Sequence, residues 1–243
     1  MPTVLILGAG SDIAVALARR YAAAGFTLQL AGRNPEQLRP LEQDLRIRHR
    51  IAATVHAFDA LDFASHAGFY RALPAPPDVV LCVFGYLGSQ EKGQENWQEA
   101  SRILHTNFTG AVSILNVVAE DMAARGKGTI IGISSVAGDR GRMSNYLYGS
   151  AKAGFTTYLS GLRNRLWHSG VHVMTVEPGF VATQMTEHLA LPALLTAQPD
   201  EVAKDIFKAA ERKKNVLYTK WFWRYIMMII KNVPEPIFKK KKL

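Results

Sequence analysis

Thr3-Val4-Leu5-Ile6-Leu7-Gly8-Ala9-Gly10-Ser11-Asp12, at residues 3–12 of a 243-residue chain, joins a short apolar run to a glycine-containing turn. Beyond the turn, apolar residues recur at helical spacing from Ile13 to Tyr21, and Gly25 marks the expected end of a helix. A buried strand, a tight turn and a helix are therefore predicted in this order. Repeated along a chain, this unit builds a parallel sheet that helices cover.

The same alternation of strands and helices continues through most of the chain. The predicted strands cover residues 3–7, 26–31, 52–58, 78–84, 128–133, 171–176 and 216–219. Further helices are predicted from Pro35, with Asn34 as N-cap, and over residues 97–105, 108–124, 145–168 and 199–213. The length suits one large core. The pattern predicts an α/β fold with one doubly wound domain over residues 1–219 and a C-terminal amphipathic appendage over 220–243.

The first turn and the end of the second predicted strand indicate a dinucleotide site. Gly8 and Gly10 let the backbone approach a pyrophosphate, and the following helix offers free N–H groups to it. The second strand ends in Gly32-Arg33-Asn34, with no carboxylate before Glu36. Arginine at this place favours the 2′-phosphate of NADP, so NADP(H) is the expected cofactor and NAD(H) stays possible. The alternative is a solvated loop arginine.

Tyr148 and Lys152 lie four residues apart in a predicted helix, so that both side chains point from one face. An ammonium group at this distance is expected to lower the pKa of a phenol, which acid–base chemistry near neutral pH requires. Ser134 and Ser135 end the fifth predicted strand, where a parallel sheet forms its ligand crevice. Such pairs also arise by chance, and serines also cap strands and helices.

Several motifs in the right order make the chain resemble the short-chain dehydrogenase/reductase family. The resemblance covers residues from about 3 to 219. It implies a Rossmann domain with a parallel sheet of strand order 3-2-1-4-5-6-7. The motifs are Ile133-Ser134-Ser135-Val136-Ala137-Gly138, Tyr148-Gly149-Ser150-Ala151-Lys152, Leu104-His105-Thr106-Asn107-Phe108-Thr109-Gly110, Phe58-Asp59-Ala60 and Pro178-Gly179-Phe180-Val181-Ala182-Thr183.

The resemblance also implies residue roles in an NADP(H)-dependent oxidoreductase that transfers a hydride between nicotinamide and a carbonyl or alcohol. Tyr148 would exchange a proton with the substrate oxygen, to which Ser135, thirteen residues earlier, would hydrogen-bond. Lys152 would hold the nicotinamide ribose and bias Tyr148 toward ionisation, and Asn107 would position a water that links Lys152 to solvent. The residues expected to bind the cofactor are Gly8, Gly10, Ser11, Asp12, Ile13, Arg33, Asp59, Ala60, Gly85, Tyr148, Lys152, Pro178, Gly179, Val181 and Thr183. No metal site is expected.

Two stretches depart from the family pattern. Where the family has Gly-Ile-Gly, this chain has Asp12-Ile13-Ala14, and Asp12 is expected to cap the turn. Where the family has Asn-Asn-Ala-Gly, this chain has Cys82-Val83-Phe84-Gly85, so packing is expected to replace a hydrogen-bond network.

The charge distribution and the single cysteine limit which partners and which location are expected. The last 33 residues hold ten basic and two acidic residues, so they carry +8 of the net charge of +9. A nucleic-acid binder spreads its basic residues over a face instead, and no nucleic-acid partner is expected. Cys82 is the only cysteine and no secretory signal is visible, which favours a reducing, cytoplasmic location.

The tail combines an aromatic and aliphatic run over residues 221–230 with lysines up to Lys242. The run is about half of the roughly 20 apolar residues that cross a bilayer, but it suits the inner, anionic face of a membrane. A lipid-linked carbonyl substrate would fit such a place, with residues 189–195 as a lid. The tail resembles that of reductases of a decaprenylphosphoryl keto-pentose. The alternatives are a soluble ketone or alcohol reductase whose tail forms a homo-oligomer contact, and a non-catalytic NADP-binding regulator.

Overall fold

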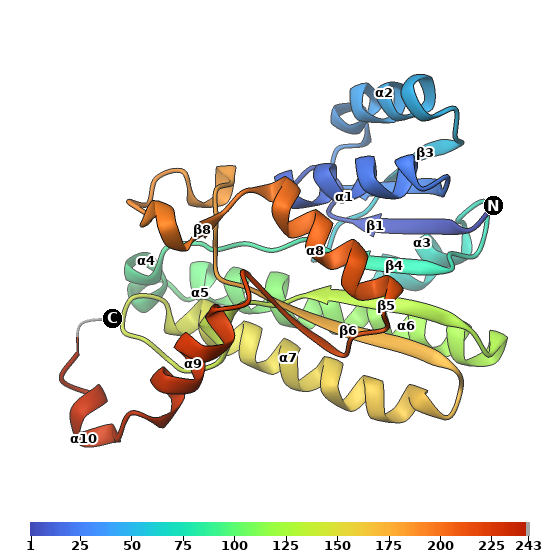
Figure 1. Cartoon of the computed structure of the whole chain (residues 1–243). Coiled ribbons are helices and arrows are strands. Elements are labelled where there is room, and N and C mark those ends of the chain that lie inside the picture. Colours follow the sequence, from blue (N-terminus) through green and yellow to red (C-terminus); the bar gives the residue numbers. More distant parts are fainter. Residues whose placement is uncertain (242–243) are drawn as a thin grey trace.

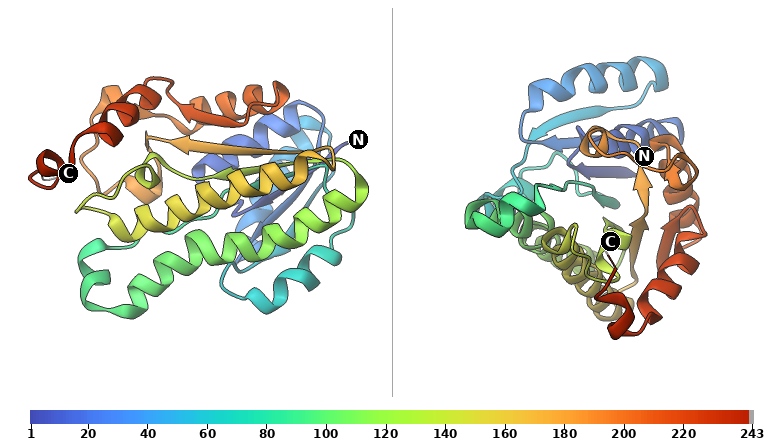
Figure 2. Two further views of the ribbon diagram at one scale, coloured as in Figure 1. Left: turned by 90° about the horizontal axis from the view of Figure 1, so that it is seen from below. Right: turned by 90° about the vertical axis from the view of Figure 1, so that its left-hand side faces the viewer.

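A computed structural model describes residues 1–241 of the protein. Lys242, part of the predicted basic cluster, lies outside the described residues. Seven parallel strands form one sheet, with helices on both of its faces (Figures 1 and 2). Their order in space is β3 (Ala53–Ala57), β2 (Thr27–Gly32), β1 (Thr3–Leu7), β4 (Val79–Cys82), β5 (Gly128–Ile133), β6 (Val171–Pro178) and β9 (Val216–Thr219).

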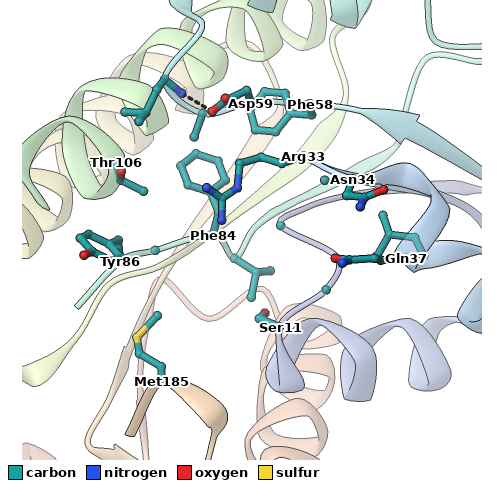
Figure 3. A pocket seen from close by; sticks show the side chains of 18 of the residues that line it. Ser11, Arg33, Asn34, Gln37, Phe58, Asp59, Phe84, Tyr86, Thr106 and Met185 are labelled. Carbon is teal, nitrogen blue, oxygen red and sulfur yellow. Dashed lines mark hydrogen bonds between the residues drawn. The ribbon is translucent and has the colours of Figure 1, made fainter. Parts of the chain in front are cut away.

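This arrangement confirms the predicted α/β fold and the strand order 3-2-1-4-5-6-7, with β9 as the seventh strand of the sheet. The carboxyl ends of the parallel strands meet at one edge, into which Figure 3 looks. Two short strands, β7 (Phe180–Val181) and β8 (Thr196–Ala197), form a separate pair that was not predicted, because two residues give no periodicity.

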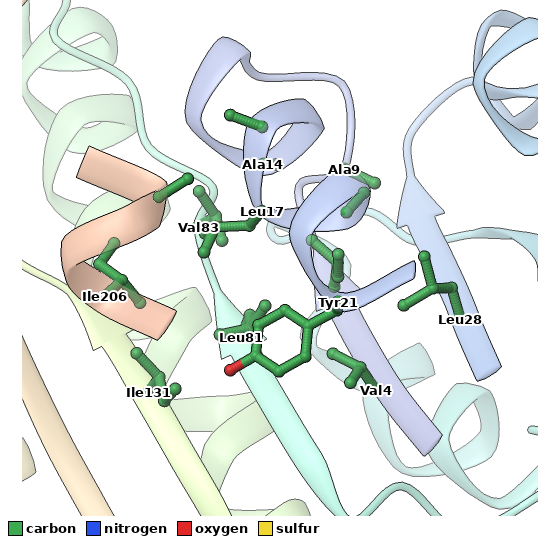
Figure 4. Packing of buried hydrophobic residues seen from close by; sticks show 14 of the residues in the cluster. Val4, Ala9, Ala14, Leu17, Tyr21, Leu28, Leu81, Val83, Ile131 and Ile206 are labelled. Carbon is green, nitrogen blue, oxygen red and sulfur yellow. The ribbon is translucent and has the colours of Figure 1, made fainter. Parts of the chain in front are cut away.

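Helices cover both faces of the sheet because the central strands are largely apolar, so that successive side chains present apolar groups to opposite faces. Val4 and Ile6 face one core with α1 (Asp12–Ala23), α2 (Arg39–His49) and α8 (Pro199–Glu211). Figure 4 shows Leu17 and Tyr21 of α1 in this layer. Leu5 and Leu7 face the other core with α3 (His66–Arg71), α6 (Gly110–Arg125) and α7 (Tyr146–Trp167). Both cores are therefore built on the same strands.

The helix expected from Pro35 is divided in two. A 3₁₀ turn, Pro35–Leu38, precedes α2, and Asn34 accepts no capping hydrogen bond. Pro40 stands in the first turn of α2, where its missing N–H is tolerated, so the α-helix begins at Arg39. The predicted positions of Asn34 as N-cap and of Pro35 at the start of the helical turn are confirmed, although the Asn34 side chain makes no capping hydrogen bond.

The segment after β4 holds two more helices, α4 (Gln90–Glu95) and α5 (Trp97–Leu104). The helix expected over 108–124 is continuous with α5, because a π-helical turn, His105–Thr109, joins α5 to α6. A π turn inserts one extra residue into a helix and is frequent at functional sites. Asn107 lies in this turn.

The C-terminal segment forms α9 (Trp223–Asn232) and α10 (Glu235–Phe238), drawn in red in Figure 1. One side of α9 packs on the main domain, where Trp223 and Met227 are buried beside Val136. The opposite side is exposed. Among residues 1–241 no helix has both the length and the apolar character that crossing a bilayer requires.

Candidate active site

A cavity of about 600 Å³ opens at the carboxyl ends of the strands (Figure 3). It brings together seven residues that were predicted to bind the cofactor: Gly8, Gly10, Ser11, Arg33, Asp59, Ala60 and Gly85. Eight predicted cofactor residues do not line this cavity: Asp12, Ile13, Tyr148, Lys152, Pro178, Gly179, Val181 and Thr183.

The turn after β1 needs glycine at position 8 for two reasons. Gly8 has φ +84°, and a Cβ there would lie 2.6 Å from the backbone nitrogen of Phe84. Ser11 is the N-cap of α1, and its hydroxyl accepts from the N–H of Ala14. The cavity therefore meets a helix N-terminus and a close-lying backbone, as an anionic pyrophosphate requires.

The prediction that Asp12 caps this turn is wrong. Ser11 already holds the capping position, because its backbone is extended and Asp12 is the first helical residue. The Asp12 carboxylate instead accepts from the backbone N–H of Gln184 at 2.8 Å. It thereby joins the start of α1 to the segment after β7.

The wall beyond β2 is formed by Arg33, Asn34 and Gln37. Glu36, the first carboxylate after the strand, is exposed and forms an ion pair with Arg39 at 3.1 Å. No side chain of this wall is a carboxylate, so a negatively charged ligand meets only cationic and neutral groups here. At the other wall Asp59 accepts from the backbone N–H of Leu61, the dashed line in Figure 3.

Tyr148 and Lys152 stand one turn apart on α7, beside the end of β5. The Lys152 ammonium is buried, donates to the carbonyl of Ile133 at 2.9 Å and lies 5.6 Å from the centre of the Tyr148 ring. Ser134 is engaged elsewhere, since its hydroxyl donates to the Lys152 carbonyl. Ser135 caps the 3₁₀ turn that follows β5, where its hydroxyl accepts from the N–H of Ala137, and its side chain is near enough to Tyr148 to lower the pKa of the phenol.

Burial shifts both titrating groups away from their charged forms. It raises the pKa of Tyr148 from 10.0 to about 12, and the hydrogen bond from Ser135 opposes this only in part. It lowers the pKa of Lys152 from 10.5 to about 8, against the opposite effect of Cys82. The expected lowering of the Tyr148 pKa is therefore wrong for this structure, because the loss of hydration outweighs the hydrogen bond from Ser135.

Asn107 is buried in the π turn and holds the chain after β4. Its amide donates to the carbonyls of Tyr86 at 2.6 Å and Ile103 at 2.8 Å, and its oxygen accepts from the N–H of Tyr86. Gly85 lies between Asn107 and the lysine: a Cβ there would be 3.0 Å from Asn107 Oδ1 and 3.7 Å from Lys152 Nζ. Because Gly85 also lines the cavity, the cavity ends next to Lys152.

The Pro-Gly segment leaves β6 and is supported by the C-terminal helix. A Cβ at Gly179 would lie 2.0 Å from Trp223 Nε1, so only glycine admits this indole ring. Phe180 meets the same ring edge-on at 5.2 Å. Thr183 caps a 3₁₀ turn, Gln184–Thr186, and Val181 is buried in the core.

Sequence reasoning missed several residues of the cavity wall: Asn34, Gln37, Phe84, Tyr86, Arg102, Thr106 and Met185. Tyr86 follows the strand-end Gly85, which was a usable signal. The centre of its ring lies 4.2 Å from the Arg102 guanidinium, a contact between residues 16 positions apart that no helical or strand periodicity predicts. Met185 lines the site from the segment after β7. Its side chain lies close to Gly85, since a Cβ built on Gly85 would be 3.9 Å from Met185 Cε.

The family model for short chain dehydrogenases matches residues 2–192. An uncharacterized oxidoreductase of Mycobacterium tuberculosis is 37% identical over 240 residues, which are 98% of this chain and 96% of that protein. A sulfoacetaldehyde reductase of Chromohalobacter salexigens is 32% identical over 75% of this chain and 74% of its own. A short-chain dehydrogenase from Sphingobium yanoikuyae, solved in complex with NADPH, has a TM-score of 0.84 and 24% identity over 97% of each chain.

Proposed function

This chain is an oxidoreductase that belongs to the short-chain dehydrogenase family, and on that premise we propose that it reduces a carbonyl group with NADPH. The observation that carries the proposal is the convergence of Ser135, Tyr148 and Lys152 beside one end of the strand-edge cavity. NADPH bound in that cavity supplies the hydride. The chain supplies the proton and the groups that orient the carbonyl.

The proposed roles follow from the protonation state of each group near neutral pH. The Tyr148 phenol is neutral below its raised pKa of about 12, so it can give its proton to the oxygen that gains charge during reduction. Ser135 donates a second hydrogen bond to that oxygen. Lys152 stays protonated below its pKa of about 8 and stabilises the phenolate that remains. Asn107 keeps the wall at Gly85 and Tyr86 in place, and its free oxygen lone pair is left for a water beside Lys152.

The preference for NADP(H) over NAD(H) is supported by the wall beyond β2. Arg33 lines the cavity, while the carboxylate of Glu36 is paired with Arg39. The Sphingobium protein with the same fold binds NADPH. Arginine binds a phosphate through two parallel hydrogen bonds, which a ribose hydroxyl cannot accept in the same way.

We expect Arg33→Ala to weaken the use of NADPH more than that of NADH. Loss of a charge-assisted bond of about 1.5–3 kcal/mol lowers kcat/KM for NADPH by roughly 10- to 100-fold. Oxidation of both cofactors is measured against a panel of carbonyl compounds that includes lipid-phosphoryl sugars. Arg102→Ala, on the opposite wall of the cavity, is the control. An equal loss with both cofactors would contradict the assignment to the 2′-phosphate.

Contact with an anionic membrane surface is the second part of the proposal. It is supported by an exposed apolar row on the outer side of the tail, which we term the outer stripe: Trp221, Tyr225, Met228 and Ile229. Trp221 is 74% exposed and Ile229 is 65% exposed, although both are strongly apolar. Lys231 and residues 239–241 follow the stripe in the sequence, are exposed and add positive charge to the same C-terminal segment. Aromatic side chains next to lysines suit the headgroup level of a bilayer.

A lipid-linked or otherwise amphiphilic substrate would approach from the same side. The expected lid, residues 189–195, is tied to the tail, because Lys220 donates to the carbonyl of Leu194 and Trp223 donates to that of Leu195. Leu194 is 83% exposed, and its carbonyl is bonded to Lys220, the residue before the first member of the outer stripe. An apolar chain entering past the lid could therefore stay in contact with both.

We expect Tyr225→Ser with Ile229→Ser to weaken sedimentation with anionic vesicles by at least about tenfold, because two apolar groups no longer enter the interface. Deleting residues 220–243 would be a poor test, since it removes the buried Trp223 and Met227 as well. The matched control is Trp97→Ser with Ile47→Ser, two side chains exposed elsewhere. Unchanged vesicle binding together with a changed oligomeric state would instead favour the soluble reductase whose tail joins two copies.

A further inference from the structure

A second cavity, which we term the α8–β9 groove, lies at the edge of the sheet outside the proposed active site. Its volume is about 460 Å³. Two carboxylates, Glu201 and Asp205, line it together with five basic side chains, so its lining carries an excess of three positive charges. The basic side chains are Lys204, Lys208, Arg212, Lys214 and Lys220.

Three of the five cations stand on α8 and at its end with a spacing of four residues, Lys204, Lys208 and Arg212. Like charges at this spacing face one another and destabilise a helix. Lys214 and Lys220 face them from the two ends of β9. Within residues 1–241 none of the five forms an ion pair with a carboxylate, and Glu201 is already used in capping α8.

The wall of the groove also holds a hydroxyl without a partner. Thr219, the last residue of β9, is 1% exposed, and its Oγ1 has no hydrogen-bond partner among the described residues. A buried hydroxyl that makes no hydrogen bond is costly. Oxygen atoms of a ligand, or a water that they order, would satisfy it. Cations that lack a carboxylate partner, together with a hydroxyl that lacks any partner, form a donor set that suits a phosphate.

We propose that the α8–β9 groove binds the phosphate of an anionic membrane lipid. The lipid source is argued from Trp221, which lines the groove and also begins the outer stripe. A phosphate in the groove would thus lie next to apolar and aromatic side chains that can enter the same bilayer. This assignment rests on the membrane contact proposed above, but it is independent of the reduction chemistry.

The first test compares sedimentation of the full chain, with NADPH present to fill the dinucleotide site, on two kinds of vesicle. One is phosphatidylcholine alone and the other also contains phosphatidylglycerol. Lys208→Gln with Arg212→Gln should weaken binding to the anionic vesicles about 30-fold, the factor for two cations at about 1 kcal/mol each. Lys92→Gln with Arg71→Gln removes the same charge from exposed positions elsewhere and should cost less than about threefold.

The second test uses Thr219→Val, which keeps the shape of the side chain and removes the orphaned hydroxyl. Replacing an unpaired buried hydroxyl with a methyl group leaves the fold as stable as before or more stable. The variant should therefore keep its Tm and its turnover while binding the anionic vesicles more weakly. Because the fold is not weakened, such a loss cannot be attributed to unfolding.

The outcomes separate this site from the membrane contact itself. Loss of anionic-vesicle binding in both groove variants, with residual binding through the outer stripe, supports the proposal. Equal losses in the groove pair and the control pair would overturn it, since only overall charge would then matter. Titration with inorganic phosphate adds a further arm: phosphate binding that falls in the groove variants while vesicle binding does not would overturn the lipid assignment.

Discussion

At the scale of single residues, loss of hydration shifts the pKa values of Tyr148 and Lys152 in opposite directions. The pKa of the phenol is about 12 and that of the ammonium is about 8. Near neutral pH the pair is therefore a neutral acid beside a cation. This is the state that reduction of a carbonyl needs, whereas oxidation of an alcohol needs the phenolate.

We expect the two directions of the reaction to respond oppositely to pH. Reduction should fall as pH rises through about 8, because Lys152 loses the charge that stabilises the phenolate. Oxidation should rise with pH above neutrality, because more phenolate forms. Initial rates in both directions between about pH 6 and about pH 10 give the two profiles. Reduction that stays flat through about pH 8 would contradict the role of Lys152.

Unfolding linked to Lys152 does not explain such a loss of activity. Its folded pKa of about 8 lies below the usual 10.5, so the unfolded state binds more protons between these values. The contribution of Lys152 to stability therefore increases as pH rises through this window. For Tyr148, whose pKa is raised from 10.0, stability falls only above about pH 10.

At the scale of elements, Arg140 joins the C-terminal helices to the segment that follows Ser135. Its guanidinium donates to the carbonyls of Ile230 and Val233, at 2.6 Å each, and pairs with Glu235 at 2.9 Å. It also lies 3.6 Å from the centre of the Phe238 ring. Ile230 lies in the last turn of α9 and Val233 is its C-cap, so the Arg140 side chain adds charged donors to the end of that helix.

We expect Arg140→Met to lower the free energy of unfolding by about 2–3 kcal/mol, because two half-buried carbonyls lose charged donors. It should also expose the chain after residue 220 to proteases. Urea unfolding and limited proteolysis measure the two effects. Lys231→Met is the control, since Lys231 is half exposed and 3.8 Å from Asp139, a contact worth less than about 1 kcal/mol. Equal destabilisation by both variants would contradict the account of Arg140.

The periodicity of the sequence predicted the seven strands of the sheet closely, since β1, β5 and β9 have their predicted bounds. It did not reveal the π turn around Asn107, because one inserted residue barely disturbs helical spacing. The prediction that Asp12 caps the first turn was wrong, because its partner, the backbone N–H of Gln184, lies 172 positions away in the chain. Partners so distant leave no local pattern.

At the scale of the whole molecule, the tail shows what composition cannot decide. The run over residues 221–230 is apolar on both sides of its helix: Trp223 and Met227 face the domain, while Tyr225 and Ile229 face outward. The sequence was therefore compatible with a free appendage and with a helix packed on the domain. In the structure one side of the helix is packed and the other is exposed. The cavity was predicted at its glycines and Arg33, but Arg102 and Met185 reach it only through tertiary structure.

The central claim is that Tyr148 is the proton donor of a reaction in which the bound dinucleotide gives a hydride. Tyr148→Phe keeps the ring and removes the proton, so we measure its NADPH oxidation with a good carbonyl substrate beside its affinity for NADPH. Turnover should fall by roughly 10²- to 10⁴-fold, with NADPH binding unchanged within about threefold. Turnover that persists within about tenfold of the natural protein would contradict the account.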